Sequence, residues 1–213
     1  MKQLEKDLLL YGVTDRAWLG DRTLAQQVEE AVLGGATFIQ LREKTLTGDA
    51  LLAEARDVRD VCRKHGIPFV INDSVELAER VGADGVHVGQ GDMEAGKARE
   101  ILGPDKIIGV SAKTVEQALL AEKNGADYLG VGAVFPTGSK SDASVISHET
   151  LKAICSAVKI PVIAIGGITA DNVKELRGSG ICGVAVISAL FAKQDVRAAA
   201  GDMRRQVLEM LGK

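Results

Sequence analysis

The sequence predicts an α/β protein, a single-domain (β/α)8 TIM barrel that spans residues 1–213. Eight short runs rich in β-branched residues alternate with segments that have helical spacing and are rich in Ala, Leu, Glu and Lys. The runs are nearly continuous in apolar residues, which is typical of parallel strands buried on both faces. No composition break or long Pro/Ser linker divides the chain, and its 213 residues suit a compact barrel of this kind.

The expected strands begin near residues 8, 36, 68, 84, 106, 127, 161 and 182. In chain order they read LLLYGV, ATFIQL, PFVIN, DGVHV, KIIGV, DYLGVGAVF, PVIAIGG and CGVAVIS. The helical segments between them include TLAQQVEEAVLGG, GDALLAEARDVRDVCRKHG, TVEQALLAEKNG and HETLKAICSAVK. A doubly wound open sheet is the alternative, but it should carry a GxGxxG turn after the first strand, and YGVTDRAW has none.

Composition argues against several classes of function. Aromatic residues make up 3% of the chain and the formal net charge is -3, which does not suit a nucleic-acid binder with stacking platforms and a basic face. The N-terminus lacks the ordered regions of a signal peptide, and no apolar run approaches the roughly 20 residues that span a bilayer. We therefore expect a cytoplasmic protein without nucleic-acid or membrane partners, and a homo-oligomer is left open. Cys62, Cys155 and Cys182 form no CxxC pair, so we expect buried free thiols and neither a disulfide framework nor a zinc site.

The barrel prediction carries a rule for function, because working residues of this fold sit at the C-terminal ends of the strands. Polar residues do gather at these positions, whereas the starts of the strands mostly offer ordinary caps and prolines. In chain order the residues at the strand ends are Thr14 and Asp15, Gln40, Arg42 and Lys44, Asn72 and Asp73, His87, Gln90 and Asp92, Ser111, Thr137, the glycines Gly166 and Gly167, and Ser188.

The segment QLREK places two cations after an apolar strand. Alternate side chains of a strand face the same way, so Gln40, Arg42 and Lys44 could share the face toward the pore, where the two cations need an anion. The alternative is a solvated charge run in which Glu43 pairs with Arg42 and Lys44.

The last two strands indicate a phosphate monoester site, since the loops after strands seven and eight commonly bind phosphate in this fold. In AIGGIT, Gly166 and Gly167 would let the backbone approach a ligand, and Thr169 is expected to begin a helix whose free amide groups favour anions. Ser188 is expected to open another short helical stretch.

Two carboxylates stand beside a second, more heavily charged anion site near Arg42, Lys44 and Lys140. Carboxylates would repel a phosphate unless a cation lay between them, and Mg²⁺ typically uses one or two carboxylates with phosphate oxygens and water. Asp73 and Asp92 therefore predict a magnesium diphosphate site. As an alternative, each could cap a helix, SVELAERV for the first and MEAGKAREIL for the second.

A set of motifs in order along essentially the whole chain resembles the thiamine phosphate synthase family. They are YGVTD, QLREK, IND, GADGVHVGQGD, IGVSAKTVEQA, GADYLGVGAVFPTGSK, IPVIAIGGIT and GVAVISAL. The resemblance implies a transferase that joins 4-amino-5-hydroxymethyl-2-methylpyrimidine diphosphate to 4-methyl-5-(2-phosphoethyl)thiazole and releases diphosphate. It also implies a Mg²⁺ cofactor and a dissociative mechanism through a pyrimidine methylene cation.

The resemblance assigns residues to each part of the site. The pyrimidine diphosphate would contact Gln40, Arg42, Lys44, Asn72, Ser111 and Lys140. The thiazole phosphate side would be formed by Thr137, Ser139, Gly167, Ile187 and Ser188. Asp73 and Asp92 would hold Mg²⁺, and the catalytic set would be Arg42, Lys44, Ser111 and Lys140.

The loop after the sixth strand departs from the family pattern, because it reads PTGSK where PTSTK is usual. Ser139 keeps a hydroxyl donor, and Gly138 adds freedom to a loop that is expected to fold over the diphosphate. Three alternatives stay open: a thiazole tautomerase paralogue, which lacks the full diphosphate set; a phosphosugar isomerase or epimerase; and a non-catalytic ligand-binding barrel. His87 either lines the pocket or is a structural histidine.

Overall fold

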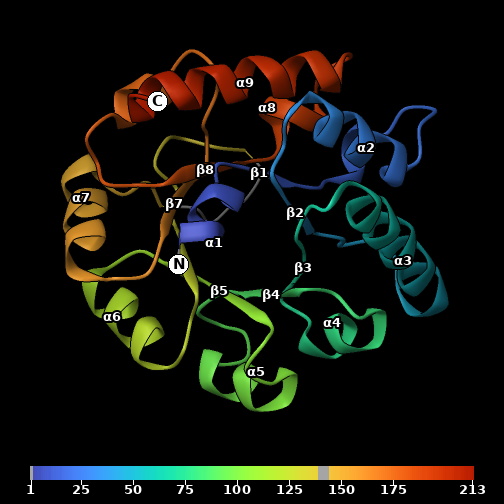
Figure 1. The fold of residues 1–213 in the computed structure, drawn as a ribbon, viewed down its shortest axis with the longest axis horizontal. Coiled ribbons are helices and arrows are strands. Elements are labelled where there is room, and N and C mark those ends of the chain that lie inside the picture. The colour runs from blue at the N-terminus through green and yellow to red at the C-terminus, as the bar shows by residue number, and fades with distance from the viewer. Residues whose placement is uncertain (1, 139–143) are drawn as a thin grey trace.

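The computed structural model describes residues 2–138 and 144–213 and shows a closed barrel of parallel strands (Figure 1). The strands follow one another around the barrel in chain order, and β8 closes it against β1. The predicted TIM barrel is therefore confirmed. The strands are β1 Leu10–Val13, β2 Phe38–Leu41, β3 Phe69–Asn72, β4 Gly85–Val88, β5 Ile107–Ala112, β6 Tyr128–Val131, β7 Val162–Ile165 and β8 Gly183–Val186.

Helices surround the barrel and cover the outer faces of its strands (Figure 1). Side-chain caps begin several of them: at the start of α2, for example, Thr23 and Gln26 form a reciprocal capping box. The outer helices are α2 Leu24–Gly34, α3 Gly48–His65, α4 Val75–Val81, α5 Ala95–Leu102, α6 Val115–Lys123, α7 His148–Ala157, α8 Ser188–Phe191 and α9 Val196–Leu211. The chain also forms two short 3-10 turns, η1 Arg16–Trp18 and η2 Val173–Leu176.

The segment after β7 differs from the expected helix at Thr169. Its regular structure is the turn η2, which begins four residues later at Val173. The amide of Thr169 donates to Asn172 Oδ1 (2.8 Å), and the Asn172 side chain donates to the Gly167 carbonyl (2.9 Å). Residues 170–172 form a turn and not an α-helix, so the prediction of a helix beginning at Thr169 was wrong.

The core has two layers, because side chains of each strand alternate between the barrel interior and the surrounding helices. The interior layer contains Tyr11, Phe38, Val70, Tyr128 and Ile163. The outer layer packs the opposite faces of the strands against the helices. The barrel interior is thus a packed core and not a pore.

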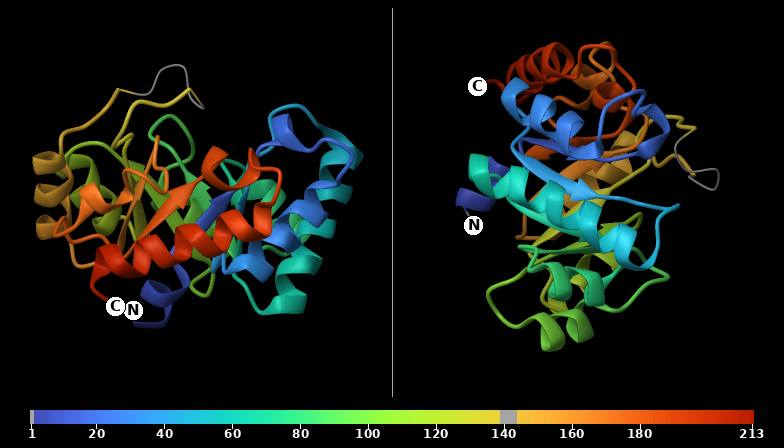
Figure 2. Two further views of the ribbon diagram at one scale, coloured as in Figure 1. Left: turned by 90° about the horizontal axis from the view of Figure 1, so that it is seen from above. Right: turned by 90° about the vertical axis from the view of Figure 1, so that its right-hand side faces the viewer.

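A helix that the sequence did not predict lies at the N-terminal end of the barrel. Helix α1, Lys2–Asp7, lies inside the ring of strands when the barrel is viewed along its axis (Figure 1). Leu4 packs on the interior layer, and Leu8, just after the helix, is completely buried. Both chain ends lie at this face of the molecule, as Figure 2 shows. The helix therefore closes the bottom of the barrel.

Membrane and cysteine predictions can be compared with the part of the chain that the structure describes. Within it, no helix combines the length and apolar character needed to cross a bilayer. Cys62 is buried, Cys155 and Cys182 are partly buried, and all three are free thiols. Burial raises the pKa of the Cys155 thiol to about 11 and those of the other two to about 12. The expectation of a buried free thiol is confirmed for Cys62, whereas Cys155 and Cys182 are free thiols that are only partly buried.

Candidate active site

Gln40, Arg42 and Lys44 come from the end of β2, as the QLREK pattern predicts. Gln40 is buried inside the barrel, where its amide nitrogen donates a 2.7 Å hydrogen bond to the Tyr11 hydroxyl. The Arg42 guanidinium lies beside Asp15, with 3.4 Å between Nη1 and Oδ2. Its Nε atom is buried and has no hydrogen-bond partner among the described residues. Arg42 thus keeps a donor that a ligand could use.

Glu43 takes part in a different interaction from the charge run considered as an alternative. Its carboxylate accepts a 2.8 Å bond from Arg16, and it also accepts the backbone N–H groups of Thr45 (2.6 Å) and Leu46 (3.1 Å). Burial by itself would raise the pKa of Glu43, but these bonds outweigh it and lower the pKa to about 2. The carboxylate is held by Arg16 and not by the cations on either side of it.

The loops after β2, β3 and β4 bring one cation and two carboxyl groups together. Lys44 Nζ lies 3.1 Å from Asp73 Oδ2, and the Asn72 side chain also hydrogen-bonds to Asp73. Asp92 accepts the N–H of Gly89 at 2.8 Å and is within hydrogen-bonding reach of Asp73. Asp73 and Asp92 therefore lie close to one another at this end of the barrel.

The electrostatics of the two carboxyl groups differ. Burial favours a raised pKa for both. For Asp73, hydrogen bonds with Asp92 and Lys44 outweigh burial, and the pKa is lowered. For Asp92, burial and the neighbouring negative charge of Asp73 raise the pKa despite the bond from Gly89. A cation placed between the two oxygens would relieve this repulsion.

Neither carboxylate is the cap of the helix that follows it, which was the alternative for both. Ser74 is the N-cap of α4, where its hydroxyl accepts the N–H of Leu77. Glu94 precedes the first residue of α5. Asp73 instead has a φ of 64°, and its N–H donates to the His87 carbonyl at 2.8 Å.

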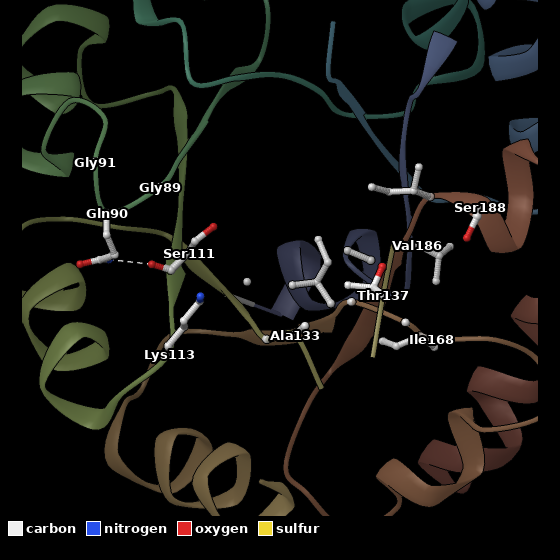
Figure 3. A pocket seen from close by; sticks show the side chains of 17 residues that line it. Gly89, Gln90, Gly91, Ser111, Lys113, Ala133, Thr137, Ile168, Val186 and Ser188 are labelled. Atoms are coloured by element: carbon white, nitrogen blue, oxygen red, sulfur yellow. Dashed lines mark hydrogen bonds between the residues drawn. The ribbon is translucent and has the colours of Figure 1, made fainter. Parts of the chain in front are cut away.

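A cavity of about 370 Å³ opens beside this cluster at the ends of β4 to β8. Its polar side chains come from two sides (Figure 3). Gln90, Ser111 and Lys113 lie on one side, and Thr137 and Ser188 lie on the other. Two groups of polar side chains facing one cavity suit a ligand with polar groups at both ends.

Five of the residues that the family resemblance assigns to the site line this cavity. The lining includes Ser111, Thr137, Gly167, Ile187 and Ser188. The charged rim beside it carries Arg42, Lys44, Asp73 and Asp92, and Gln40 and Asn72 come from the barrel interior below the rim; none of these six residues is part of the described lining. Ser139 and Lys140 lie outside the described residues, so their predicted roles stay predictions.

Lys113 lines the cavity although it was not among the predicted residues. Its ammonium group points toward the cavity in Figure 3 and lies 3.3 Å from the Ser144 hydroxyl. The sequence did contain a signal: Lys113 follows Ser111 by two residues, the same alternation as in the QLREK segment. A cation and a hydroxyl on one side of the cavity favour an anionic group there.

The paired glycines after β7 have a structural reason beyond ligand approach. A side chain at Gly166 would collide with Ala133, and one at Gly167 would collide with the carbonyls of Phe135 and Pro136. Both glycines also have positive φ, 97° and 67°. They allow the loops after β6 and β7 to pack closely and form one wall of the cavity.

The fold and the site define an α/β-barrel protein whose carboxyl-end rim carries both cations and carboxylates beside a cavity. The family described as thiamine monophosphate synthase matches residues 10–190, and the chain belongs to this family. Thiamine-phosphate synthase of Clostridium tetani is 50% identical over 197 residues, covering 92% of this chain and 94% of the relative. The same enzyme of Ruminiclostridium cellulolyticum is 48% identical over 194 residues, which are 91% of this chain and 92% of the relative.

A solved structure gives the same result in three dimensions. Thiamine phosphate pyrophosphorylase from Pyrococcus furiosus superposes with a TM-score of 0.90 at 44% sequence identity, covering 98% of this chain and 100% of that one. With this similarity over nearly the whole length, the chain is a transferase with thiamine-phosphate synthase activity.

Proposed function

We propose that the enzyme condenses 4-amino-5-hydroxymethyl-2-methylpyrimidine diphosphate with 4-methyl-5-(2-phosphoethyl)thiazole in a Mg²⁺-dependent reaction. The products are thiamine phosphate and diphosphate. The observation that carries the proposal is the carboxyl pair Asp73 and Asp92, which lies with Lys44 beside the cavity. Two carboxylates next to cations suit a metal-bound diphosphate better than either group alone.

The donor set fits Mg²⁺. Asp73 and Asp92 lie close to one another. Burial raises the pKa of Asp92, and the negative charge of Asp73 raises it further. Mg²⁺ typically takes one or two carboxylates and completes its ligands with substrate phosphate oxygens and water. Asp73 and Asp92 would hold the ion, and when bound it would offset the negative charge of the leaving diphosphate.

The remaining rim residues would bind the pyrimidine diphosphate. Arg42 offers its unpartnered Nε to an anionic oxygen, and Lys44 adds a charge close to the carboxyl pair. Lys140 would join them from the loop after β6. We assign Gln40 and Asn72 to orienting the pyrimidine, since both come from the barrel interior below the rim. Preorganised cations of this kind stabilise charge that develops on a leaving group.

The reaction would proceed in two steps. The bond between the pyrimidine methylene carbon and the diphosphate oxygen breaks first, and its electron pair leaves with the diphosphate. The methylene cation is then delocalised into the aminopyrimidine until the thiazole nitrogen attacks with its lone pair. Because neither step needs a protein nucleophile, the residues act by stabilising charge and by orienting the two substrates.

The thiazole phosphate would occupy the far side of the cavity. Thr137 and Ser188 offer hydroxyl groups there, and Gly167 and Ile187 contribute backbone. Ser139 would add a further hydroxyl. The thiazole phosphate would then bind across the cavity from Ser111 and Lys113 (Figure 3), and the pyrimidine diphosphate would bind on their side.

The test is an assay of the purified protein with both substrates and Mg²⁺. We expect thiamine phosphate and diphosphate in equal amounts, detected by chromatography, and no product after EDTA. Added Mg²⁺ in excess of EDTA should restore the reaction. Failure to form product under complete conditions would contradict the proposal, and full activity in EDTA would contradict its metal requirement.

A further inference from the structure

A continuous chain of hydrogen bonds crosses the interior of the barrel below the cavity. Gln40 Nε2 donates to the Tyr11 hydroxyl (2.7 Å), which lies 2.9 Å from the Tyr128 hydroxyl. The Tyr128 hydroxyl lies 2.9 Å from His87 Nδ1, and His87 Nε2 lies 3.0 Å from Ser111 Oγ. These five residues come from β2, β1, β6, β4 and β5, and we call them the relay.

The relay is enclosed by the protein. Gln40 is 4% exposed, His87 is 7% exposed, and the two tyrosines are 1% or less. Burial raises the pKa of both phenols far above its ordinary value, so both keep their protons near neutral pH. Each buried phenol therefore has one proton to donate, and leaving such a proton without an acceptor costs about 1–3 kcal/mol.

Two glycines make room for the central part of the relay. A Cβ at Gly109 would overlap the Tyr128 hydroxyl and lie 2.5 Å from His87 Nδ1. A Cβ at Gly130 would lie 3.0 Å from His87 Cε1. Neither glycine has positive φ, so space and not backbone conformation accounts for them. Glycine at these positions of β5 and β6 thus leaves the space in which the side chains of His87 and Tyr128 meet.

The hydrogen bonds of the relay can all point in one direction, with each hydroxyl accepting one bond and donating the next. An amide nitrogen donates and does not accept, so the Tyr11 oxygen accepts from Gln40. The proton of Tyr11 then needs its own acceptor, and Tyr128 is its other hydrogen-bond partner among the described residues. Tyr11 therefore donates to Tyr128, and Tyr128 donates its proton to His87 Nδ1.

This order fixes the tautomer of His87 and the role of Ser111. With Nδ1 accepting, the imidazole carries its proton on Nε2 and donates it to Ser111 Oγ. Ser111 then has its own proton left to donate, and its side chain lines the cavity on the same side as Lys113 (Figure 3). A hydroxyl in this state is a donor to an anionic oxygen.

We propose that Tyr11, Tyr128 and His87 are positioning residues that hold the Ser111 hydroxyl as a hydrogen-bond donor to an anionic group in the cavity. Identifying that group as the leaving diphosphate rests on the function proposed above, whereas the proton order of the relay does not. The relay links residues up to 117 positions apart in the chain and acts on the ligand through Ser111 alone.

The proton order is tested first, in the resting protein and without substrates. In protein labelled with ¹⁵N-histidine, we expect the His87 resonances to show a protonated Nε2 and an unprotonated Nδ1, with the assignment made from their loss in His87→Gln. Tyr128→Phe removes the donor to Nδ1 and should shift the ring toward the other tautomer. A parent protein with the proton on Nδ1 would overturn the proposal.

The link to catalysis is tested by a double-mutant cycle. We expect Ser111→Ala and Tyr128→Phe each to lower kcat about 10-fold or more, as for loss of a bond to a charged group, with the KM for the thiazole phosphate changed less than about twofold. If Tyr128 acts through Ser111, the double variant should be no slower than Ser111→Ala. Independent effects that multiply would mean a structural role and overturn the proposal.

Two controls separate this result from other failures. Ser156→Ala, an exposed serine of α7, should leave kcat unchanged, and thermal unfolding should show that every variant is folded. If the protein made no thiamine phosphate, the affinity for inorganic diphosphate, measured by calorimetry, would replace kcat in the same cycle. The His87 tautomer and the double-mutant cycle on diphosphate affinity would therefore still test the relay if the proposed function were wrong.

Discussion

Asp73 has a backbone conformation that few residues other than glycine adopt, with a φ of 64°. Asp and Asn tolerate this region better than other side chains, but it still stores strain. The strained residue is held by its N–H bond to His87 and by Lys44 and Asn72 at its carboxylate. Because both its backbone N–H and its carboxylate are held, Asp73 directs the carboxylate toward Asp92, which suits its proposed role as a metal ligand.

The substitution Asp73→Asn tests this role with little change to the backbone, since Asn also tolerates positive φ. Removing the charge should lower kcat roughly 100-fold or more, because metal stabilisation of a leaving group is worth several kcal/mol. The Tm should stay within about 3 °C. Steady-state kinetics at several Mg²⁺ concentrations and thermal unfolding provide the measurements.

Asp105→Asn is the matched control, because Asp105 is exposed in the loop that precedes β5, at the opposite end of the barrel from the site. It should behave as the parent protein does. Parent-like kcat for Asp73→Asn at low Mg²⁺ would mean that Asp73 does not hold the ion.

At the scale of elements, the loop between β2 and α3 is organised by a buried carboxylate. Glu43 binds Arg16 of η1 and the first N–H groups of the loop, and Arg16 also contacts Glu54 of α3. The side chain of Glu43 is only 2% exposed. This contact fixes the segment that carries Arg42 and Lys44, so the loop is part of the scaffold of the site.

The lowered pKa of Glu43 predicts a pH-dependent stability. Its folded pKa of about 2 lies below the unfolded value of 4.5, so the stabilisation is complete above about pH 4.5 and is lost as the pH falls toward 2. It amounts to about 3 kcal/mol at most. The raised pKa of Glu54, caused first by burial, acts in the opposite direction and reduces the net effect.

Urea unfolding of the parent and of Glu43→Gln from pH 7 to pH 3 measures this effect. The variant should be less stable at pH 7, and the gap in the free energy of unfolding should narrow below about pH 4.5. Glu76→Gln is the control, because this side chain of α4 is 79% exposed and its ion pair should contribute less than about 1 kcal/mol. A constant gap across the pH range would refute the assignment.

At the scale of the whole molecule, the two ends of the barrel have separate tasks. The carboxyl ends of the strands carry the cavity and the charged rim, whereas α1 and Leu8 fill the opposite end. The packed interior between them holds the relay. Stability at the closed end can therefore be changed without altering the chemistry at the open end.

Leu8→Ala tests this separation. Leu8 is fully buried, so we expect a loss of about 2–5 kcal/mol in the free energy of unfolding. At 25 °C, where the variant remains folded, kcat and both KM values should match those of the parent. Leu119→Ala on α6, where the side chain is 44% exposed, should cost less than about 0.5 kcal/mol. A large change in KM for Leu8→Ala would show that the two ends are coupled.

Much of the fold and of the site could be predicted because each depends on local patterns. The eight apolar runs predicted the strands to within a few residues, and residues just past their ends reached the rim or lined the cavity. The helix expected at Thr169 failed because Asn172 and Gly167 form a turn that periodicity does not reveal. Helix α1 was missed because its few residues precede the first strand without a cap signal.

By itself, the sequence determined the barrel, its open end and the residue types available there, because strand alternation and strand ends are properties of neighbouring residues. The tertiary structure decided which of those residues meet. Glu43 contacts Arg16 and leaves Arg42 and Lys44 to other partners, and Tyr11 meets Tyr128 from 117 positions away. These pairings follow from the closure and register of the barrel, which bring distant strands together and which no local pattern specifies.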